Sequence, residues 1–340
     1  MKPVIICGGV GTKMWPESQP TSPKHFLPLI NGKSLFELNW ESLRKKFAAT
    51  DIFLQTNEVQ AAIARKLVPE IVPENIFVEP EMRNQGPATG FAAAQLIKRG
   101  LGDEPFILIQ ADLLRMDEKK FFTAIGMADE IARKENVYLT GSMVPEEVVV
   151  GVDYLVRGEL VEEVNGVRLY RVADYVDRSE KEKIESMINS GKLMLHWNHS
   201  TMTPNKMMAM FEKYKPEWSG PLKKIIDGGD VAENYAMMPK GPLEEVTALM
   251  HRDGGSVIME FTFKVWDFGT WESVAKYLGD ENVNKIEIEA QNNFVRSEKK
   301  VAIIGLSDLA VIDSPNGILV CPKKQSGRVG EVVEKLKTIG

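Results

Sequence analysis

A regular alternation of short apolar runs with amphipathic segments along residues 1–143 is the strongest constraint on how this chain folds. Apolar runs predict buried strands, and segments with a helical period predict amphipathic helices. Strands that alternate with helices favour an α/β fold with a largely parallel sheet covered on both faces, whose ligands bind at the carboxyl ends of the strands. The expected strands are 4–7, 51–56, 75–79, 105–112 and 136–143, and the expected helices are 34–47 (with a capping-box pattern at Ser34 and Glu37), 57–67, 86–99 and 117–133.

The rest of the chain is less regular. Helices are expected at 180–191, which Gly191 ends, and at 203–214, whose methionines are expected to fill the core. We expect a separate small β unit beyond a boundary near residue 280, and a solvated turn at the charged run 296–300. Short apolar runs between turn residues predict its strands at 285–290, 294–297, 299–306, 309–315 and 317–322, followed by a helix at 326–338.

Charge and composition limit the classes of ligand. The 340 residues include 42 basic and 48 acidic side chains, a net charge of −6, so no general basic surface for nucleic acid or an anionic membrane is expected. Residues 1–50 differ, with seven Lys/Arg against three acids, and indicate an anionic ligand near this segment. No apolar run approaches the roughly 18 residues of a membrane span. Cys7 and Cys321 lie in apolar runs, which is typical of buried free thiols in a reducing compartment, and we expect a cytoplasmic protein.

The segment 7–29 carries the strongest functional signal. A buried strand runs into Gly8, Gly9 and Gly11, whose missing side chains let backbone N–H groups approach a phosphate chain. Two lysines, Lys13 and Lys24, add positive charge around a proline-rich turn. The segment lacks the GKS or GKT of a Walker A loop, and its helix begins too late for a GxGxxG dinucleotide fingerprint. The glycines alone could equally mark a tight turn.

Taken as a whole, the segment resembles the signature of the sugar-1-phosphate nucleotidylyltransferases, most closely the mannose-1-phosphate guanylyltransferases. Further stretches resemble that family at 79–88, 110–112, 234–238, 266–271 and 301–321. The signature positions in register are Gly8, Gly9, Gly11, Thr12, Trp15, Pro16, Ser18, Pro23, Lys24, Phe26 and Leu27.

The resemblance implies a fold, a reaction and partners. The fold would be a Rossmann-like nucleotidyltransferase domain with a mainly parallel mixed sheet over 1–280, followed by a small β-helix-like domain over 281–340 that is used in dimerisation. The reaction would be in-line transfer of a guanylyl group from GTP to mannose-1-phosphate, which yields GDP-mannose and pyrophosphate. Because both reactants are anionic, catalysis would consist mostly of positioning and charge neutralisation, with Mg²⁺ as the cofactor.

The resemblance also implies roles for individual residues. Asp112 and Asp267 would hold Mg²⁺, Lys13 would meet the β- and γ-phosphates and Lys24 the α-phosphate. Either aspartate could instead be a simple turn or cap acid, and the two glycine and asparagine positions on the sugar side could be turn residues. The nucleotide-binding set would be Gly8, Gly9, Gly11, Thr12, Asn84, Gly86, Pro87, Gln110 and Ala111, and the sugar-binding set Gly151, Asn198 and Arg171.

Departures from the family pattern gather on the sugar side. The family's sugar-phosphate lysine lies in a Phe-x-Glu-Lys-Pro motif, and the matching stretch 170–176 has no lysine. Loss of a cation opposite a phosphate dianion weakens charge-assisted binding unless Arg168, Arg171 or Arg178 replaces it. Two alternatives follow: a nucleotidylyltransferase for another sugar-1-phosphate or base, or a non-catalytic nucleotide-binding paralogue. His196 and His199 have no further ligand at zinc spacing.

Overall fold

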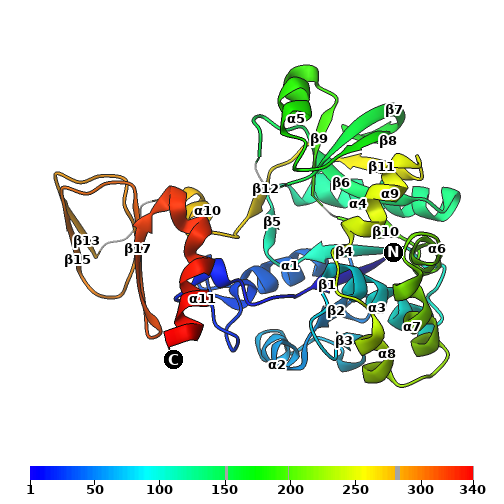
Figure 1. The fold of residues 1–340 in the computed structure, drawn as a ribbon, viewed down its shortest axis with the longest axis horizontal. Coiled ribbons are helices and arrows are strands. Elements are labelled where there is room, and N and C mark those ends of the chain that lie inside the picture. The colour runs from blue at the N-terminus through cyan, green and yellow to red at the C-terminus, as the bar shows by residue number, and fades with distance from the viewer. Residues whose placement is uncertain (150–151, 198, 280–283, 340) are drawn as a thin grey trace.

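The computed structural model describes residues 1–149, 152–197, 199–279 and 284–339. Its main element is a ten-stranded sheet in the order β11-β8-β7-β9-β6-β10-β4-β1-β2-β3, in which β11 also pairs with β6 (Figure 1). The strands of this sheet are β1 (Lys2–Ile6), β2 (Phe53–Thr56), β3 (Ile76–Val78), β4 (Phe106–Gln110), β6 (Tyr138–Met143), β7 (Tyr154–Val164), β8 (Val167–Val176), β9 (Leu193–His196), β10 (Thr201–Met202) and β11 (Ser256–Glu260).

The first half of the chain folds as its alternating pattern predicts. Strands β4, β1, β2 and β3 pair in parallel, and the remaining strands complete a mixed sheet. Ser34 and Glu37 form the predicted capping box at the start of the first helix. The α/β fold class is therefore confirmed. The α-helices of the described residues are α1 (Leu35–Arg44), α2 (Glu58–Leu67), α3 (Gln85–Lys98), α4 (Glu118–Glu135), α5 (Lys181–Met187), α6 (Pro204–Tyr214), α7 (Pro216–Ile226), α8 (Val231–Met237), α9 (Glu244–Arg252), α10 (Trp271–Leu278) and α11 (Val329–Ile339).

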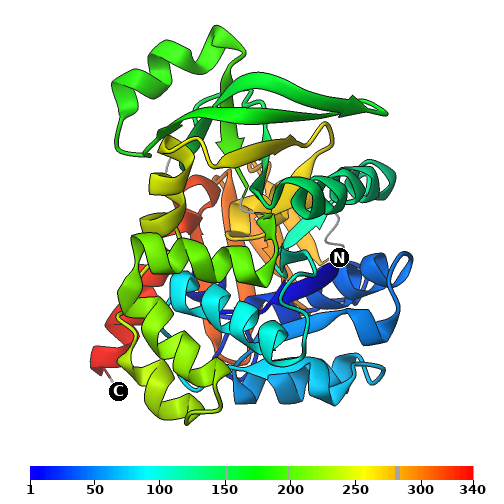
Figure 2. The same ribbon diagram turned by 90° about the vertical axis from the view of Figure 1, so that its right-hand side faces the viewer.

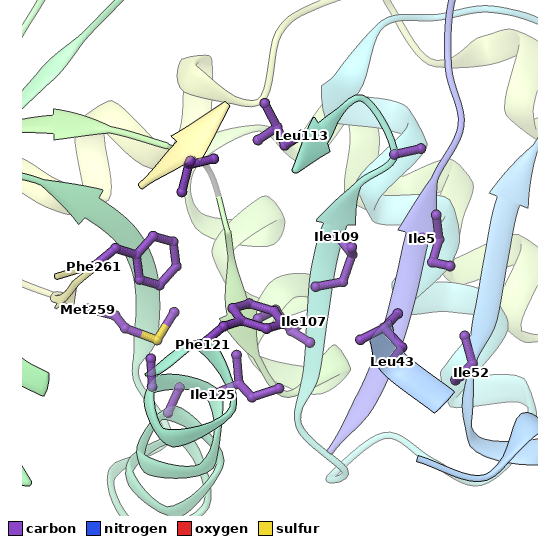
Figure 3. Close-up of a cluster of buried hydrophobic side chains, with 14 of the residues drawn as sticks. Ile5, Leu43, Ile52, Ile107, Ile109, Leu113, Phe121, Ile125, Met259 and Phe261 are labelled. Carbon is purple, nitrogen blue, oxygen red and sulfur yellow. The ribbon is translucent and has the colours of Figure 1, made fainter. Parts of the chain in front are cut away.

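Two hydrophobic layers lie on opposite faces of the sheet because successive strand side chains point to opposite sides. Ile5, Ile107 and Ile109 lie on one side, where α1 and α4 cover them (Figure 3). Val4 and Leu108 belong to the other layer, with α3, α6 and α7. The expected core role of the α6 methionines is confirmed, since Met207, Met208 and Met210 are all buried there.

Several elements of the middle region were not predicted. Strands β7 and β8 form a long hairpin that runs across the top of the molecule in Figure 2. Helices α7, α8 and α9 follow the predicted α6 without any expected counterpart. Among the described residues, no helix has the length and apolar character needed to cross a membrane.

The C-terminal unit (residues 284–339) contains the expected short strands and closing helix. Strand β13 (Lys285–Ile288) pairs in parallel with β15 (Val301–Ile304), and β14 (Phe294–Arg296) pairs in parallel with β16 (Leu309–Ser314). Strand β17 (Gly317–Pro322) runs antiparallel to β16. The unit projects to the left of the sheet in Figure 1, with β13 and β15 at its outer end. The predicted boundary between residues 280 and 281 lies outside the described residues.

Candidate active site

A small two-stranded sheet brings two aspartates to the carboxyl edge of the main sheet. Asp112 follows β4 and directly precedes β5 (Leu113–Arg115). Strand β12 (Val265–Asp267) runs antiparallel to β5, so that Asp267 lies opposite Leu113. The Phe268 N–H donates to the Asp112 carbonyl over 3.4 Å. The two residues expected to hold a metal are therefore neighbours, although 155 positions separate them in the sequence.

The two carboxyl groups are electrostatically distinct. Burial disfavours ionisation of Asp112, but the Lys24 ammonium, which forms an ion pair with its Oδ2, outweighs burial and holds the pKa below its usual range. Burial and the neighbouring Asp112 raise the pKa of Asp267. The positive charges of Lys24 and Lys13 lower the pKa of Asp267, so both lysines are near enough to act on this carboxyl. The site thus has two acids and two cations close together.

These donors fit a hard divalent cation. Carboxylate oxygens are typical Mg²⁺ ligands, and Mg²⁺ usually takes only one or two of them from the protein, with water and substrate phosphates supplying the rest. The described residues contain no group of three or more His, Cys, Asp or Glu side chains that could hold a metal ion. Asp112 and Asp267 are therefore a donor set suited to a metal that arrives with a nucleotide.

The three loop glycines have different surroundings. Gly8 and Gly9 are exposed, and a Cβ atom added to either would meet nothing within 4 Å. Gly11 has a φ of +78°, and a Cβ there would lie 2.5 Å from Cγ of Lys24. The backbone of Gly8 and Gly9 is thus open to a ligand, whereas Gly11 makes room for the Lys24 side chain. Thr12 and Lys13 come next, exposed, on a 3-10 turn at Thr12–Met14.

A cavity of about 370 Å³ adjoins the glycine loop and Asp112. Five residues that the sequence assigned to the nucleotide or metal line it: Gly8, Gly9, Asn84, Gln110 and Asp112. Asn84 is the N-cap of α3, and its side chain accepts from the Gln85 N–H over 2.8 Å. The Gln110 side-chain Nε2 is buried without a hydrogen-bond partner. The cavity lining therefore includes a glutamine whose buried Nε2 donor is unused, and the N-terminal end of a helix.

Three further residues of the predicted nucleotide-binding set lie outside the cavity lining. Gly86 packs against Trp218, whose Cη2 would lie 2.1 Å from an added Cβ. The Gly86 N–H donates to the Gly241 carbonyl over 3.0 Å. Pro87, the next residue of α3, and Ala111, directly before Asp112, are both buried. None of these three residues lines the cavity, so their role there is packing.

Other cavity residues escaped the sequence analysis. Glu79 accepts hydrogen bonds from Gln55 Nε2 (3.0 Å) and from the Tyr235 hydroxyl (2.7 Å), and burial raises its pKa. His25 also lines the cavity, bonded to Gln60 Oε1 over 3.1 Å, and burial lowers its pKa to about 4. The position of Glu79 directly after β3, at the same sheet edge as Gln110, is the signal that could have identified it.

The sugar-side predictions have mixed outcomes. Gly151 and Asn198 lie outside the described residues. Arg171 forms an ion pair with Glu135 at 2.8 Å. In the sheet, Arg171 lies opposite Val257, near the beginning of β11, so it is not at the carboxyl edge. Arg168 and Arg178, the other arginines considered, are engaged as well, the first with Glu260 and the second with Asp153.

Asp153, directly before β7, is bonded to both β9 and Arg178. It is two positions after Gly151, and its carbonyl accepts from the His196 N–H over 3.1 Å, two positions before Asn198. The Arg178 backbone N–H and Nε both donate to its Oδ1 over 2.9 Å. The His196 ring is held by Thr140 at 2.8 Å.

Comparison with known proteins identifies the sequence family. Residues 2–278 match the model of the Nucleotidyl transferase family, and residues 283–336 match the MannoseP isomerase/GMP-like beta-helix domain. The Xanthan biosynthesis protein XanB of Xanthomonas campestris is 24% identical over 353 residues, covering 99% of this chain and 73% of that protein. A mannose-1-phosphate guanylyltransferase of Klebsiella pneumoniae is 26% identical over 352 residues, covering 98% of this chain and 74% of that protein. A solved Thermus thermophilus structure, described as a mannose-1-phosphate geranyltransferase, shares the fold, with a TM-score of 0.85, 22% identity and 99% coverage of both chains.

Proposed function

The chain belongs to the Nucleotidyl transferase family, and from this premise we propose that it transfers a guanylyl group from GTP to mannose-1-phosphate. A phosphate oxygen of the sugar attacks the α-phosphorus of GTP, the bond to the β-phosphate breaks, and pyrophosphate leaves as GDP-mannose forms. The relatives named mannose-1-phosphate guanylyltransferase, which align over nearly all of this chain, support this choice of substrates.

The polar pattern of the 370 Å³ cavity is the observation that carries the proposal. Guanine presents two donors, N1–H and the 2-amino group, beside one acceptor, O6. Two lining residues match this pattern: the Glu79 carboxylate, whose oxygens accept from Gln55 and Tyr235 and have lone pairs left, and Gln110, whose buried Nε2 donor has no partner. A site built to pair with both kinds of group rejects bases that leave its buried polar atoms unpaired. This arrangement favours guanine.

The phosphate chain would extend from this cavity along the exposed backbone of Gly8 and Gly9 toward the two aspartates. Mg²⁺, held by Asp112 and Asp267, would neutralise charge on the phosphate oxygens. Lys24 would bind the α-phosphate from its place beside Asp112, and Lys13 would meet the β- and γ-phosphates with Thr12 next to it. Each charge-assisted contact would also stabilise the charge that develops on the leaving pyrophosphate.

Arg178 is our choice for the cation that receives the sugar phosphate. It contacts Asp153, whose carbonyl accepts from the His196 N–H, whereas Arg171 is bonded to Glu135. The Arg178 side chain is 49% exposed, so a ligand can reach it. A guanidinium binds a phosphate through two parallel hydrogen bonds, a geometry that a lysine lacks.

A homodimer is also proposed, formed through the C-terminal unit. Ile286, Ile288, Ile304 and Leu306 are each more than half exposed along the outer end formed by β13 and β15, where Ile288 lies opposite Ile304. Such an apolar row on a folded surface is typical of an interface. The substitution Ile304→Arg in the full chain should convert a dimer into a monomer in light scattering, and a wild-type monomer would contradict the proposal. Cys7 and Cys321 are free, which supports a cytoplasmic location.

A second candidate, a nucleotide-binding protein without turnover, is favoured by one observation. All three sugar-side arginines considered are already paired with carboxylates. The two candidates differ in pyrophosphate release when Mg²⁺, GTP and mannose-1-phosphate are supplied together. Release above the rate without sugar phosphate supports the transferase, whereas calorimetric binding of GTP without release supports the second candidate.

A further inference from the structure

The segment that carries Lys13 is packed against the C-terminal unit. We call residues 12–17 the lysine loop. Met14 is wholly buried in a hydrophobic cluster that also contains Phe294 of the C-terminal unit. A Cβ added to Gly317, whose φ is +144°, would lie 2.8 Å from the Trp15 ring. The indole of Trp15 therefore sits against a position where only glycine leaves room.

Polar contacts from the same unit hold the end of the loop. The Pro16 carbonyl accepts from Ser314 Oγ and from Asn316 Nδ2, both over 3.1 Å. Arg296 forms an ion pair with Glu17, and both side chains are largely buried. The expectation of a solvated turn at 296–300 is thus wrong for Arg296, because its guanidinium faces the body of the protein.

Lys13 itself depends on this support. Within the part of the chain that the structure describes, its ammonium has no hydrogen bond or ion pair, and it lies on a single 3-10 turn at Thr12–Met14. The direction of an unpaired side chain on so short a turn follows the backbone that carries it. That backbone is fixed on one side by Gly11 and on the other by contacts with the C-terminal unit.

We propose that the C-terminal unit positions the lysine loop for catalysis, with Arg296 as the main positioning residue through Glu17. The proposal rests on the phosphate role of Lys13 given above and extends it across the chain. A small displacement of a catalytic group costs up to about a hundredfold in rate even when the substitution is remote from the chemistry. The unit therefore takes part in turnover and does more than join two copies of the chain.

The test compares Arg296→Ala with Lys299→Ala in the full chain. Lys299 is a matched control because it belongs to the same segment but pairs outward with Asp313, with its side chain 76% exposed. We expect Arg296→Ala to lower kcat by about tenfold to a hundredfold, with little change in the KM for mannose-1-phosphate. Lys299→Ala should leave kcat unchanged. The charge-swapped pair Glu17→Arg with Arg296→Glu should recover most of the lost kcat.

Three results would overturn the proposal: wild-type kcat in Arg296→Ala, an equal loss in Lys299→Ala, or a folded swapped pair that recovers nothing. If Arg296→Ala does not fold, Asn316→Ala replaces it, since that change removes one hydrogen bond to Pro16. A lower kcat at unchanged Tm then supports positioning, and a wild-type kcat contradicts it.

Failure of the proposed function is distinguishable from failure of this inference. If the wild-type chain releases no pyrophosphate, the guanylyl transfer is wrong, and GTP affinity becomes the readout. Arg296→Ala should then weaken GTP binding while Lys299→Ala does not. Equal affinities in the two variants would overturn the positioning role.

Discussion

The proposed nucleotide side and the proposed sugar side of the site differ in how many of their charged groups are paired. On the nucleotide side, Lys24 is paired with Asp112, whereas the Lys13 ammonium has no hydrogen bond or ion pair among the described residues, Gln110 Nε2 has no hydrogen bond, and Gly8 and Gly9 are open. On the sugar side, Arg168, Arg171 and Arg178 are each bonded to a carboxylate, in two cases to one that is almost fully buried. The nucleotide side therefore keeps one unpaired cation and open backbone for an anion, whereas every arginine considered on the sugar side is already paired.

This difference bears on the order and strength of binding. A preorganised site pays little to bind its ligand, whereas a paired cation must first exchange its partner. A sugar phosphate at Arg178 would compete with Asp153, which is 3% exposed and bonded to both the guanidinium and the backbone of that residue. We therefore expect tight nucleotide binding and weaker sugar-phosphate binding, with substitutions on the nucleotide side producing the larger effects.

The largest effect is expected at Asp112, which lines the cavity and pairs with Lys24. Asp112→Asn removes the charge that would hold Mg²⁺ and that pairs with Lys24, and should lower the rate of pyrophosphate release by about 10³-fold. The fold should persist by circular dichroism, since the amide is isosteric. Asp253→Asn, an exposed aspartate paired with Lys213, is the control. An undiminished rate of pyrophosphate release in Asp112→Asn would contradict the proposed role of Asp112 as a Mg²⁺ ligand.

Next in size is the loss of a phosphate cation. Lys24→Ala should weaken GTP binding by about tenfold to a hundredfold, the value of a charge-assisted hydrogen bond. Titration calorimetry measures this directly, with Lys33→Ala as the control because Lys33 pairs with Glu41 at the surface. An unchanged GTP affinity would count against the phosphate role of Lys24.

A smaller effect is expected in the base cavity. Glu79→Gln keeps a side chain that can bond to Tyr235 but removes the carboxylate proposed to accept from the guanine 2-amino group. Inosine triphosphate lacks that amino group, so the preference of the wild type for GTP over ITP should shrink by about tenfold. Glu81→Gln at the cavity rim should leave the preference intact. A ratio that is equal in all three proteins would refute the assignment of Glu79.

The smallest effect should appear on the sugar side, where binding already includes the cost of breaking an ion pair. Arg178→Gln should raise the KM for mannose-1-phosphate about fivefold, since it removes a charge-assisted phosphate contact whose gain is already reduced by competition with Asp153. Arg171→Gln is the matched control, and its KM should stay at the wild-type value. If instead the two variants exchange behaviour, the sugar phosphate binds at the other arginine.

Local signals explain what could be predicted of the fold. The capping box at Ser34 depends on a residue three positions away, and the parallel strands are continuous apolar runs, so both are visible in the sequence. Helix α7 was missed because Pro216 and Pro221 suggest a loop, whereas buried Trp218 stabilises the helix. The β7–β8 hairpin was missed because its register shifts repeatedly around Arg157, which breaks the alternation of polar and apolar residues.

The same distinction applies to the site. The glycine loop and Gln110–Asp112 lie within contiguous motifs at strand ends, and these motifs contain their own positional signal. Glu79 lies directly after β3, a position that the sequence does show, but its place in one cavity with Gln110 depends on the order of the strands in the sheet. The contact of Arg296 with Glu17 joins residues 279 positions apart. Such long-range pairings follow from the assembled fold, and no local pattern in the sequence reports them.

The measurement that tests the central claim most directly is pyrophosphate release with Mg²⁺ over a grid of nucleoside triphosphates and hexose-1-phosphates. The account predicts one dominant signal, for GTP with mannose-1-phosphate, and a GTP affinity that exceeds the affinity for the sugar phosphate. If no combination of substrates releases pyrophosphate while calorimetry still detects GTP binding, the result would contradict guanylyl transfer. The chain would then be a nucleotide-binding protein whose sugar-side arginines stay paired with carboxylates.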